Sequence, residues 1–200
     1  MAALSDPAQP GRLHLAGDEH ADRLLAEEPL ALLLGMLLDQ QIPMERAFAA
    51  PALLAERLGQ PLRAETLAEA DPAWLEGLFA AKPALHRFPA AMARRAQALC
   101  QTLVADYQGD PSRLWTEAAD GPDLVRRLAV LPGFGEQKAK IFAALLAKQF
   151  GVRPRGWREA TAPFGEPGVF LSVADIVDPA SLAAVREAKQ AMKRAAKAAR

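Results

Sequence analysis

Apolar residues recur along most of the chain at the three- and four-residue steps that mark one face of an amphipathic helix. The clearest example runs from Met92 to Tyr107, where polar residues such as Arg94 and Gln101 fall on the other side of the helix. The same spacing predicts helices over residues 19–26, 29–41, 45–58, 64–70, 122–130, 136–150 and 180–199, with a further turn starting at 71–72. Strand-like alternation is missing from the sequence, so we predict an all-α fold.

Proline, glycine and aspartate mark where this helical pattern starts and stops. Residues 1–17 are rich in breakers and lack periodicity, so we expect a flexible lead before one helical domain over residues 18–200. Asp18, Asp71 and Asp178 each stand where an N-cap is needed. Residues 151–171 hold seven prolines and glycines, and a loop of that length is usually functional or mobile.

The composition excludes several kinds of functional site, but it does not identify a binding partner. Cys100 is the only cysteine among 200 residues, which excludes a disulfide framework and an iron–sulfur cluster held by four cysteines. The three histidines share no spacing with one another or with Cys100 that suggests a metal site. Lysine plus arginine and aspartate plus glutamate both number 24, so any basic footprint for a polyanion must be local.

One local cluster of basic residues surrounds Phe88 and Pro89. It consists of Lys82, His86, Arg87, Arg94 and Arg95. These side chains could form a basic patch, or they could simply be a solvated face. The longest apolar run, residues 29–38, is too short to span a bilayer, so we expect a cytoplasmic protein without membrane contact.

The segment from Leu131 to Ala139 holds the most specific pattern in the chain. Gly133 and Gly135 flank Phe134 directly before a predicted helix. Glycine permits left-handed backbone angles, and the unpaired amides of a first helical turn point outward with the positive end of the helix dipole behind them. A phosphate would suit that position, with Phe134 anchored in the core. The alternative is a turn that only connects two helices.

This nonamer resembles the helix-hairpin-helix signature. The stretch from Leu38 to Gln41 resembles an early helix of the same superfamily, which carries a Gln-Gln or similar pair there, and the helix over 92–107 lies between the two motifs. Together these features cover residues 29–151. The chain therefore resembles the helix-hairpin-helix (HhH-GPD) superfamily of base-excision-repair DNA glycosylases, which includes endonuclease III-like and 3-methyladenine glycosylase-like enzymes.

The resemblance implies a two-lobed all-α DNA-glycosylase-like fold, with the helix-hairpin-helix motif at about residues 122–150 and double-stranded DNA lying across a cleft. The hairpin would hold one strand, and a damaged base would be flipped out of the stack. The implied hairpin contacts to DNA are Leu131, Pro132, Gly133, Phe134, Gly135, Gln137 and Lys138. We expect a nucleoid-associated monomer without an iron–sulfur cluster. The one bound ion that the resemblance allows is a monovalent cation at the hairpin.

Gln40 and Gln41 match the family position that fills the gap left by a flipped base. An amide both donates and accepts hydrogen bonds, so it can replace those of the lost base pair. The alternative is that these two glutamines simply close a buried helix.

Hydrolysis of an N-glycosidic bond builds positive charge on the sugar, so a carboxylate near the anomeric carbon is the minimum catalytic group. The family supplies an aspartate soon after the second hairpin helix, but Glu159 is the only acid between residues 150 and 165. If residues 151–171 are an insertion, Asp175 would hold the family position; alternatively, Asp175 or Asp178 only caps the last helix. Asp39 is another carboxylate that could face the cleft, unless it is a surface residue.

The lysine that bifunctional family members use to cleave the strand would match Gln137, which cannot form a Schiff base. Lys138 lies about 100° further round the helix and is expected to point elsewhere. We therefore expect a monofunctional enzyme that hydrolyses the glycosidic bond without β-elimination.

Two features fit more than one function. Trp157, Phe164 and Phe170 could stack on a flipped base or anchor the loop to the core. The cations of the last helix, from Lys189 onward, could contact DNA or RNA, or could be solvated charges that suit a helix C-terminus. The leading hypothesis is a DNA glycosylase, and its rivals are a DNA-binding protein without catalysis and a helical protein-interaction domain.

Overall fold

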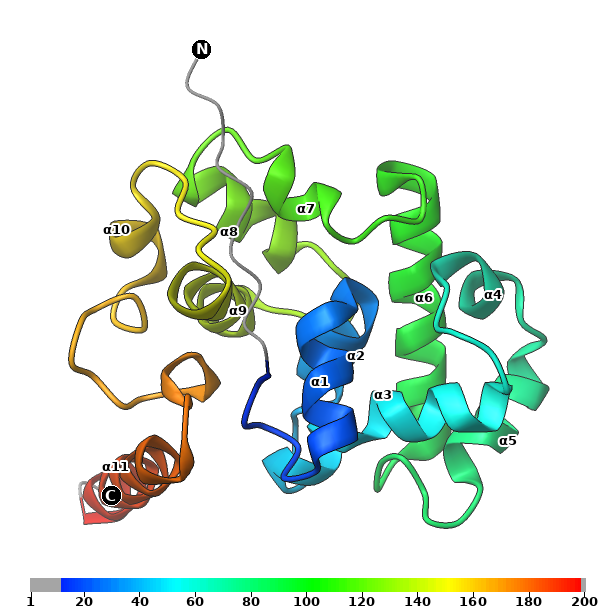
Figure 1. Ribbon diagram of the computed structural model, residues 1–200, viewed down its shortest axis with the longest axis horizontal. Helices are drawn as coiled ribbons and strands as arrows, with labels where there is room; N and C mark the ends of the chain where they lie inside the picture. Colours follow the sequence, from blue (N-terminus) through cyan, green and yellow to red (C-terminus); the bar gives the residue numbers. More distant parts are fainter. Residues whose placement is uncertain (1–11, 199–200) are drawn as a thin grey trace.

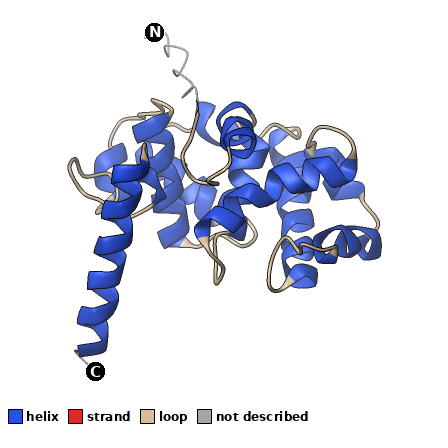
Figure 2. Cartoon of the chain, turned by 60° about the horizontal axis from the view of Figure 1, so that its bottom comes forward, coloured by secondary structure: helices blue, strands red, loops and turns tan. Residues whose placement is uncertain are grey.

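The computed structural model describes residues 12–198, and every regular element in that part of the chain is a helix (Figures 1 and 2). The prediction of an all-α fold is confirmed. In chain order the elements are α1 (Glu19–Glu27), α2 (Pro29–Leu38), α3 (Met44–Leu58), α4 (Ala64–Glu69), α5 (Pro72–Ala80), α6 (Pro89–Tyr107), α7 (Arg113–Thr116), α8 (Gly121–Ala129), α9 (Glu136–Gln149), α10 (Trp157–Thr161), the short 3₁₀ helix η1 (Val173–Asp175) and α11 (Pro179–Ala198). None of the helices in this range combines the length and apolar character needed to cross a bilayer.

The helix starts follow the capping residues that the sequence predicts. Asp18 accepts a hydrogen bond from the Ala21 amide at 2.8 Å, and Asp71 accepts one from the Trp74 amide at 2.8 Å. At the last helix the Ser181 amide donates to Asp178 at 2.7 Å. Each carboxylate thus satisfies an amide that has no acceptor within its helix, which explains why local sequence placed these boundaries well.

Helix α2 occupies the centre of the molecule because its sequence is apolar on every side. All of its residues from Leu30 to Leu38 are buried. In Figure 1, α1 and α2 lie between α3–α6 on the right and α8–α11 on the left. A helix with no polar face is stable only when surrounded, and α2 packs on α1, α3 and α6 and meets the turn before α9 at Leu37.

The α8–α9 pair packs closely around the aromatic anchor of the hairpin. Phe134 meets Phe142 edge to face, with ring centroids 6.1 Å apart, and Phe142 also meets Trp115 at 6.4 Å. Ala139 is buried in the first turns of α9, where a small side chain lets the two helices approach. The expectation that Phe134 pins the turn to the core agrees with these contacts.

The prediction of a flexible lead over residues 1–17 is wrong for its described part. Leu13 and Leu15 are fully buried, and the Asp22 carboxylate accepts hydrogen bonds from the amides of Leu15 and Ala16 at 2.7 and 2.8 Å. Apolar burial and a buried acceptor therefore hold this segment in the core, and the helical domain begins before residue 18. Residues 1–11 lie outside the described part of the chain.

Two other boundaries differ from the sequence prediction. The predicted helix over residues 29–41 ends at Leu38, and Gln41 adopts a left-handed backbone with φ of 57°. The stretch 151–171 contains α10, which packs on α8 and α9, and Phe164 packs against the core. Side-chain anchoring, which the periodicity does not encode, orders this proline-rich segment.

Candidate functional site: a cleft between α2 and the hairpin

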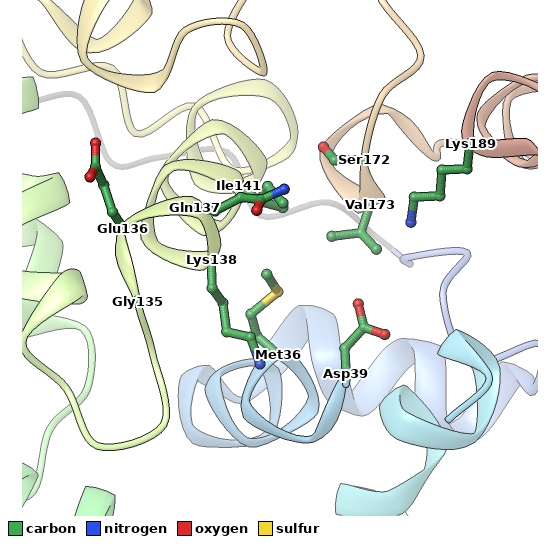
Figure 3. Close-up of a pocket in the computed structure, with 10 residues that line it drawn as sticks. All are labelled: Met36, Asp39, Gly135, Glu136, Gln137, Lys138, Ile141, Ser172, Val173 and Lys189. Atoms are coloured by element: carbon green, nitrogen blue, oxygen red, sulfur yellow. The ribbon is translucent and has the colours of Figure 1, made fainter. Parts of the chain in front are cut away.

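A cleft of about 440 Å³ lies where the end of α2, the start of α9, η1 and α11 meet (Figure 3). Its apolar lining is Met36, Ile141 and Val173. Its polar lining is Asp39, Gly135, Glu136, Gln137, Lys138, Ser172 and Lys189. The hairpin, two acids and two lysines therefore share one cleft.

The hairpin presents its backbone to solvent. Gly133 and Gly135 are both exposed, whereas Leu131 is buried beneath them. No side chain caps α9, and its first helical hydrogen bond runs from the Ala139 amide to the Gly135 carbonyl at 2.9 Å. The amides of residues 136–138 consequently have no acceptor within the helix and are available to an anion.

The two glycines are required for different reasons. Gly133 has a φ of +80°, and a Cβ there would stand 2.3 Å from Cδ1 of Leu37. Gly135 has an extended backbone with φ of −147°, and a Cβ there would meet nothing within 4 Å. The turn itself therefore needs Gly133, whereas Gly135 keeps the approach to the first turn of α9 open.

Asp39 follows the last residue of α2 and faces the cleft. Its amide donates to the Gly35 carbonyl at 3.0 Å, which places the carboxylate at the negative end of the helix dipole. Burial raises the pKa of Asp39 above its ordinary value, and the positive charges of Lys189 and Lys138 oppose that rise. Figure 3 shows the Lys189 amine reaching toward this carboxylate from α11.

Lys138 links the hairpin to α2. Its Nζ donates to the Leu37 carbonyl at 2.9 Å and lies 5.7 Å from the centre of the Phe134 ring. Burial lowers the pKa of Lys138 to about 8, although Asp39 opposes this shift. Lys138 and Gln137 point in different directions, as predicted, but Lys138 does not leave the site, since both residues line the cleft (Figure 3).

Asp175 occupies a structural position outside the cleft lining. One carboxylate oxygen accepts from the amides of Leu171 and Ser172 at 2.9 and 3.0 Å, and the other accepts from Nζ of Lys148 at 2.6 Å. The side chain is only 3% exposed, and it completes a capping box with Ser172 at the start of η1. Of the two candidate carboxylates, Asp39 is the one that the structure brings to the hairpin, whereas Asp178 caps α11.

The glutamine pair lies directly beside the cleft. Gln40 is half-buried, with Nε2 donating to the Leu37 carbonyl at 2.9 Å and Oε1 accepting from Arg95 at 3.2 Å. Gln41 is exposed. Gln40 therefore closes the end of α2, as the structural alternative proposed, and Gln41 is the member of the pair that is open to a partner.

The basic residues near Phe88 do not form the single patch that the sequence suggested. His86 is buried, with its ring nitrogen 2.8 Å from the Gln40 carbonyl, and burial lowers its pKa. Arg94 pairs with Glu76 at 2.6 Å. Packing and pairing thus remove two members of the predicted cluster from the free positive surface.

Sequence reasoning missed Lys189, Met36 and Ser172 as parts of the cleft. The basic composition of the last helix was the only available signal for Lys189, and it carries no information about which cleft the helix borders. Across residues 12–198, no group of three His, Cys, Asp or Glu side chains is placed to hold a metal ion. Comparisons of the chain with protein-family models, with curated proteins and with solved structures found no match.

Proposed function

We propose that this chain binds double-stranded DNA through its hairpin and acts as a monofunctional DNA glycosylase of the helix-hairpin-helix kind. The observation that carries the proposal is that the open first turn of α9 and the Asp39 carboxylate line the same cleft. An anion-binding turn beside a partly buried acid suits a reaction on a sugar attached to phosphates.

The DNA strand would be held mainly by backbone amides. The free amides of residues 136–138 and the positive end of the α9 dipole offer a site for one phosphate, and Lys138 lines the same cleft. Glu136 would repel a phosphate, but it pairs with Lys140 at 2.8 Å and turns away from Asp39 in Figure 3. Gln41 is open to the gap that a flipped base would leave.

The reaction that fits the cleft is hydrolysis of the bond between the sugar and a flipped base. The oxygen of water would bond to the anomeric carbon as the carbon–nitrogen bond breaks, and the base would leave with that electron pair and gain a proton. Asp39 would stabilise the positive charge on the sugar and accept the proton of the attacking water. Lys189 and Lys138 keep Asp39 closer to its ionised form, which both tasks need.

The position of Asp39 is costly for the fold, which supports a functional role. Burial and the negative end of the α2 dipole both disfavour its carboxylate. Groups held in such surroundings cluster at functional sites, because catalysis needs charge where stability alone would not place it.

The internal hydrogen bonds of Asp175 favour a second function, which is DNA binding without catalysis. Both of its oxygens are bound within the protein, so the acid nearest the family position takes no part in the cleft. If Asp39 does not supply the missing carboxylate, the chain would recognise lesions or distorted duplex without cutting the glycosidic bond.

Product formation on a panel of duplexes carrying alkylated, deaminated or oxidised bases tests the proposal. We expect Asp39→Asn to lower turnover by about 10²-fold or more, the magnitude lost with a charge-stabilising group, and to leave the protein at least as stable as wild type. Asp106→Asn, which changes an exposed acid on α6, is the matched control and should retain full activity.

Four outcomes separate the candidate functions. Salt-dependent duplex binding without product on any lesion favours the non-catalytic function. Full turnover in Asp39→Asn removes Asp39 from the mechanism, and a borohydride-trapped adduct with abasic DNA contradicts the monofunctional assignment. Absence of duplex binding at low salt contradicts the proposal as a whole.

A further inference from the structure

The distal half of α11 projects away from the body of the protein. Among the α11 residues whose burial is described, Val185 is the last that is buried, and those from Arg186 to Ala195 are exposed or, at Ala188, half-buried. Figure 2 shows this half extending beyond all other elements. Burial of apolar side chains therefore does not explain why the chain continues as a helix beyond Val185.

The sequence of this projecting half is strongly basic. From residue 186 to 198 it carries five cations and a single acid, Glu187. Positions 186, 189, 193 and 197 are separated by steps of three, four and four residues, so their backbones share one side of the helix. The chain as a whole has no net charge, which makes this stripe a local concentration of positive charge.

Two contacts show which way that side of α11 faces. Arg186 pairs with Glu45 at the start of α3, and Lys189, one turn further on, lines the cleft beside Asp39. The side that carries positions 193 and 197 is therefore the side that borders the cleft at its base. The positive stripe begins at the proposed DNA site and continues outward from it.

We infer that the projecting half of α11 is a second DNA-contact surface, which binds phosphates of the duplex flanking the base held in the cleft. The inference rests on the proposed function and adds to it a partner surface far from the hairpin. A helix rises about 1.5 Å per residue, so residues 189–198 reach roughly 14 Å, enough to follow several phosphates of a duplex with one charge per about 1.7 Å.

The test compares the salt dependence of duplex binding for wild type and the variant Lys193→Gln, Lys197→Gln. Glutamine keeps helix propensity, so the helix should persist. Losing two phosphate contacts should reduce the slope of log affinity against log salt by roughly 2 and weaken binding at least about tenfold at 0.1 M salt. Arg23→Gln, Arg113→Gln removes the same charge from α1 and α7 and should leave the slope unchanged.

The outcomes distinguish this inference from the proposed function. If the α11 variant and wild type bind a 30-base-pair lesion duplex with equal affinity and slope, the inference is overturned and hairpin binding stands. If neither protein binds the duplex, the proposed function fails and the inference falls with it. Loss of self-association, or of binding to anionic lipid vesicles, with unchanged duplex affinity would assign α11 to another partner and also overturn the inference.

Discussion

Asp39 and Asp175 show how surroundings separate two aspartates that look alike in sequence. Asp175 receives two backbone amides and a lysine, so its charge is fully used in holding η1 against α9. Asp39 is partly buried and lies at the negative end of a helix dipole, so its surroundings disfavour the charged carboxylate. A stabilised carboxylate serves structure, whereas a poorly stabilised one in a cleft is available for chemistry.

The two hairpin glycines yield a prediction at the level of single residues. Gly133→Ala should lower the free energy of unfolding by about 1–3 kcal/mol, because alanine is strained at φ of +80° and its Cβ would crowd Leu37. Gly135→Ala, whose backbone suits any residue, should cost less than about 1 kcal/mol. Urea unfolding of both variants measures this difference.

The same pair of variants separates folding from DNA contact. Gly135→Ala places a methyl group in open space at the first turn of α9, so it should weaken duplex binding although the protein remains folded. Equal duplex affinity in Gly135→Ala and wild type would contradict the assignment of this turn as the phosphate site.

Among the elements, the segment between α9 and α11 depends on a few long-range polar contacts. Gln149 on α9 donates to the carbonyls of Val173 and Ile176, each at 3.2–3.3 Å, and so holds η1 in place. Lys148 reaches both the Glu166 carbonyl at 2.9 Å and Asp175 at 2.6 Å. One turn of α9 therefore orders a proline- and glycine-rich stretch that has little periodic structure of its own.

Lys148→Met should destabilise the protein strongly. It leaves the Asp175 carboxylate buried without its charged partner, which typically costs about 3–5 kcal/mol. The double variant Lys148→Met, Asp175→Asn should cost less than the two single variants together, because neither charge is then left unpaired. A loss below about 1 kcal/mol in urea unfolding of Lys148→Met would show that the ion pair is not what orders this segment.

For the whole molecule, the proposed DNA binding predicts that duplex affinity and folding stability respond to pH in opposite directions near pH 8. Burial lowers the pKa of Lys138 to about 8, and a phosphate beside its ammonium would favour the charged form and raise that pKa again. Binding then takes up a proton, so duplex affinity should fall as the pH rises above about 8, by up to about tenfold per pH unit. Titrations at constant ionic strength measure this trend.

In the absence of DNA, the contribution of Lys138 to the free energy of unfolding should increase with pH, whereas duplex affinity decreases. Its folded pKa lies below that of an unfolded lysine, so the unfolded state binds more protons between about pH 8 and 10.5. The part of the unfolding free energy that Lys138 contributes therefore increases across that window. Lys138→Arg, which stays charged, should remove both trends, and a wild-type pH profile in this variant would assign them to other groups.

The sequence by itself determined most of the helices, the aspartate N-caps at Asp18, Asp71 and Asp178, and the turn before α9. Helical periodicity, the aspartate caps and a glycine needed at positive φ act over a few residues, so they can be predicted without knowing the rest of the fold. The burial of Leu13 ahead of α1 was missed, because the ordering of this segment depends on Asp22 and the core rather than on periodicity.

Only the tertiary structure decided which residues share the cleft. Lys138 meets the Leu37 carbonyl across 101 residues of sequence, and Lys189 comes to Asp39 from a helix whose composition says only that it is basic. Desolvation and charge pairing depend on such distant neighbours, so they separated Asp39 from Asp175 where residue type and spacing could not.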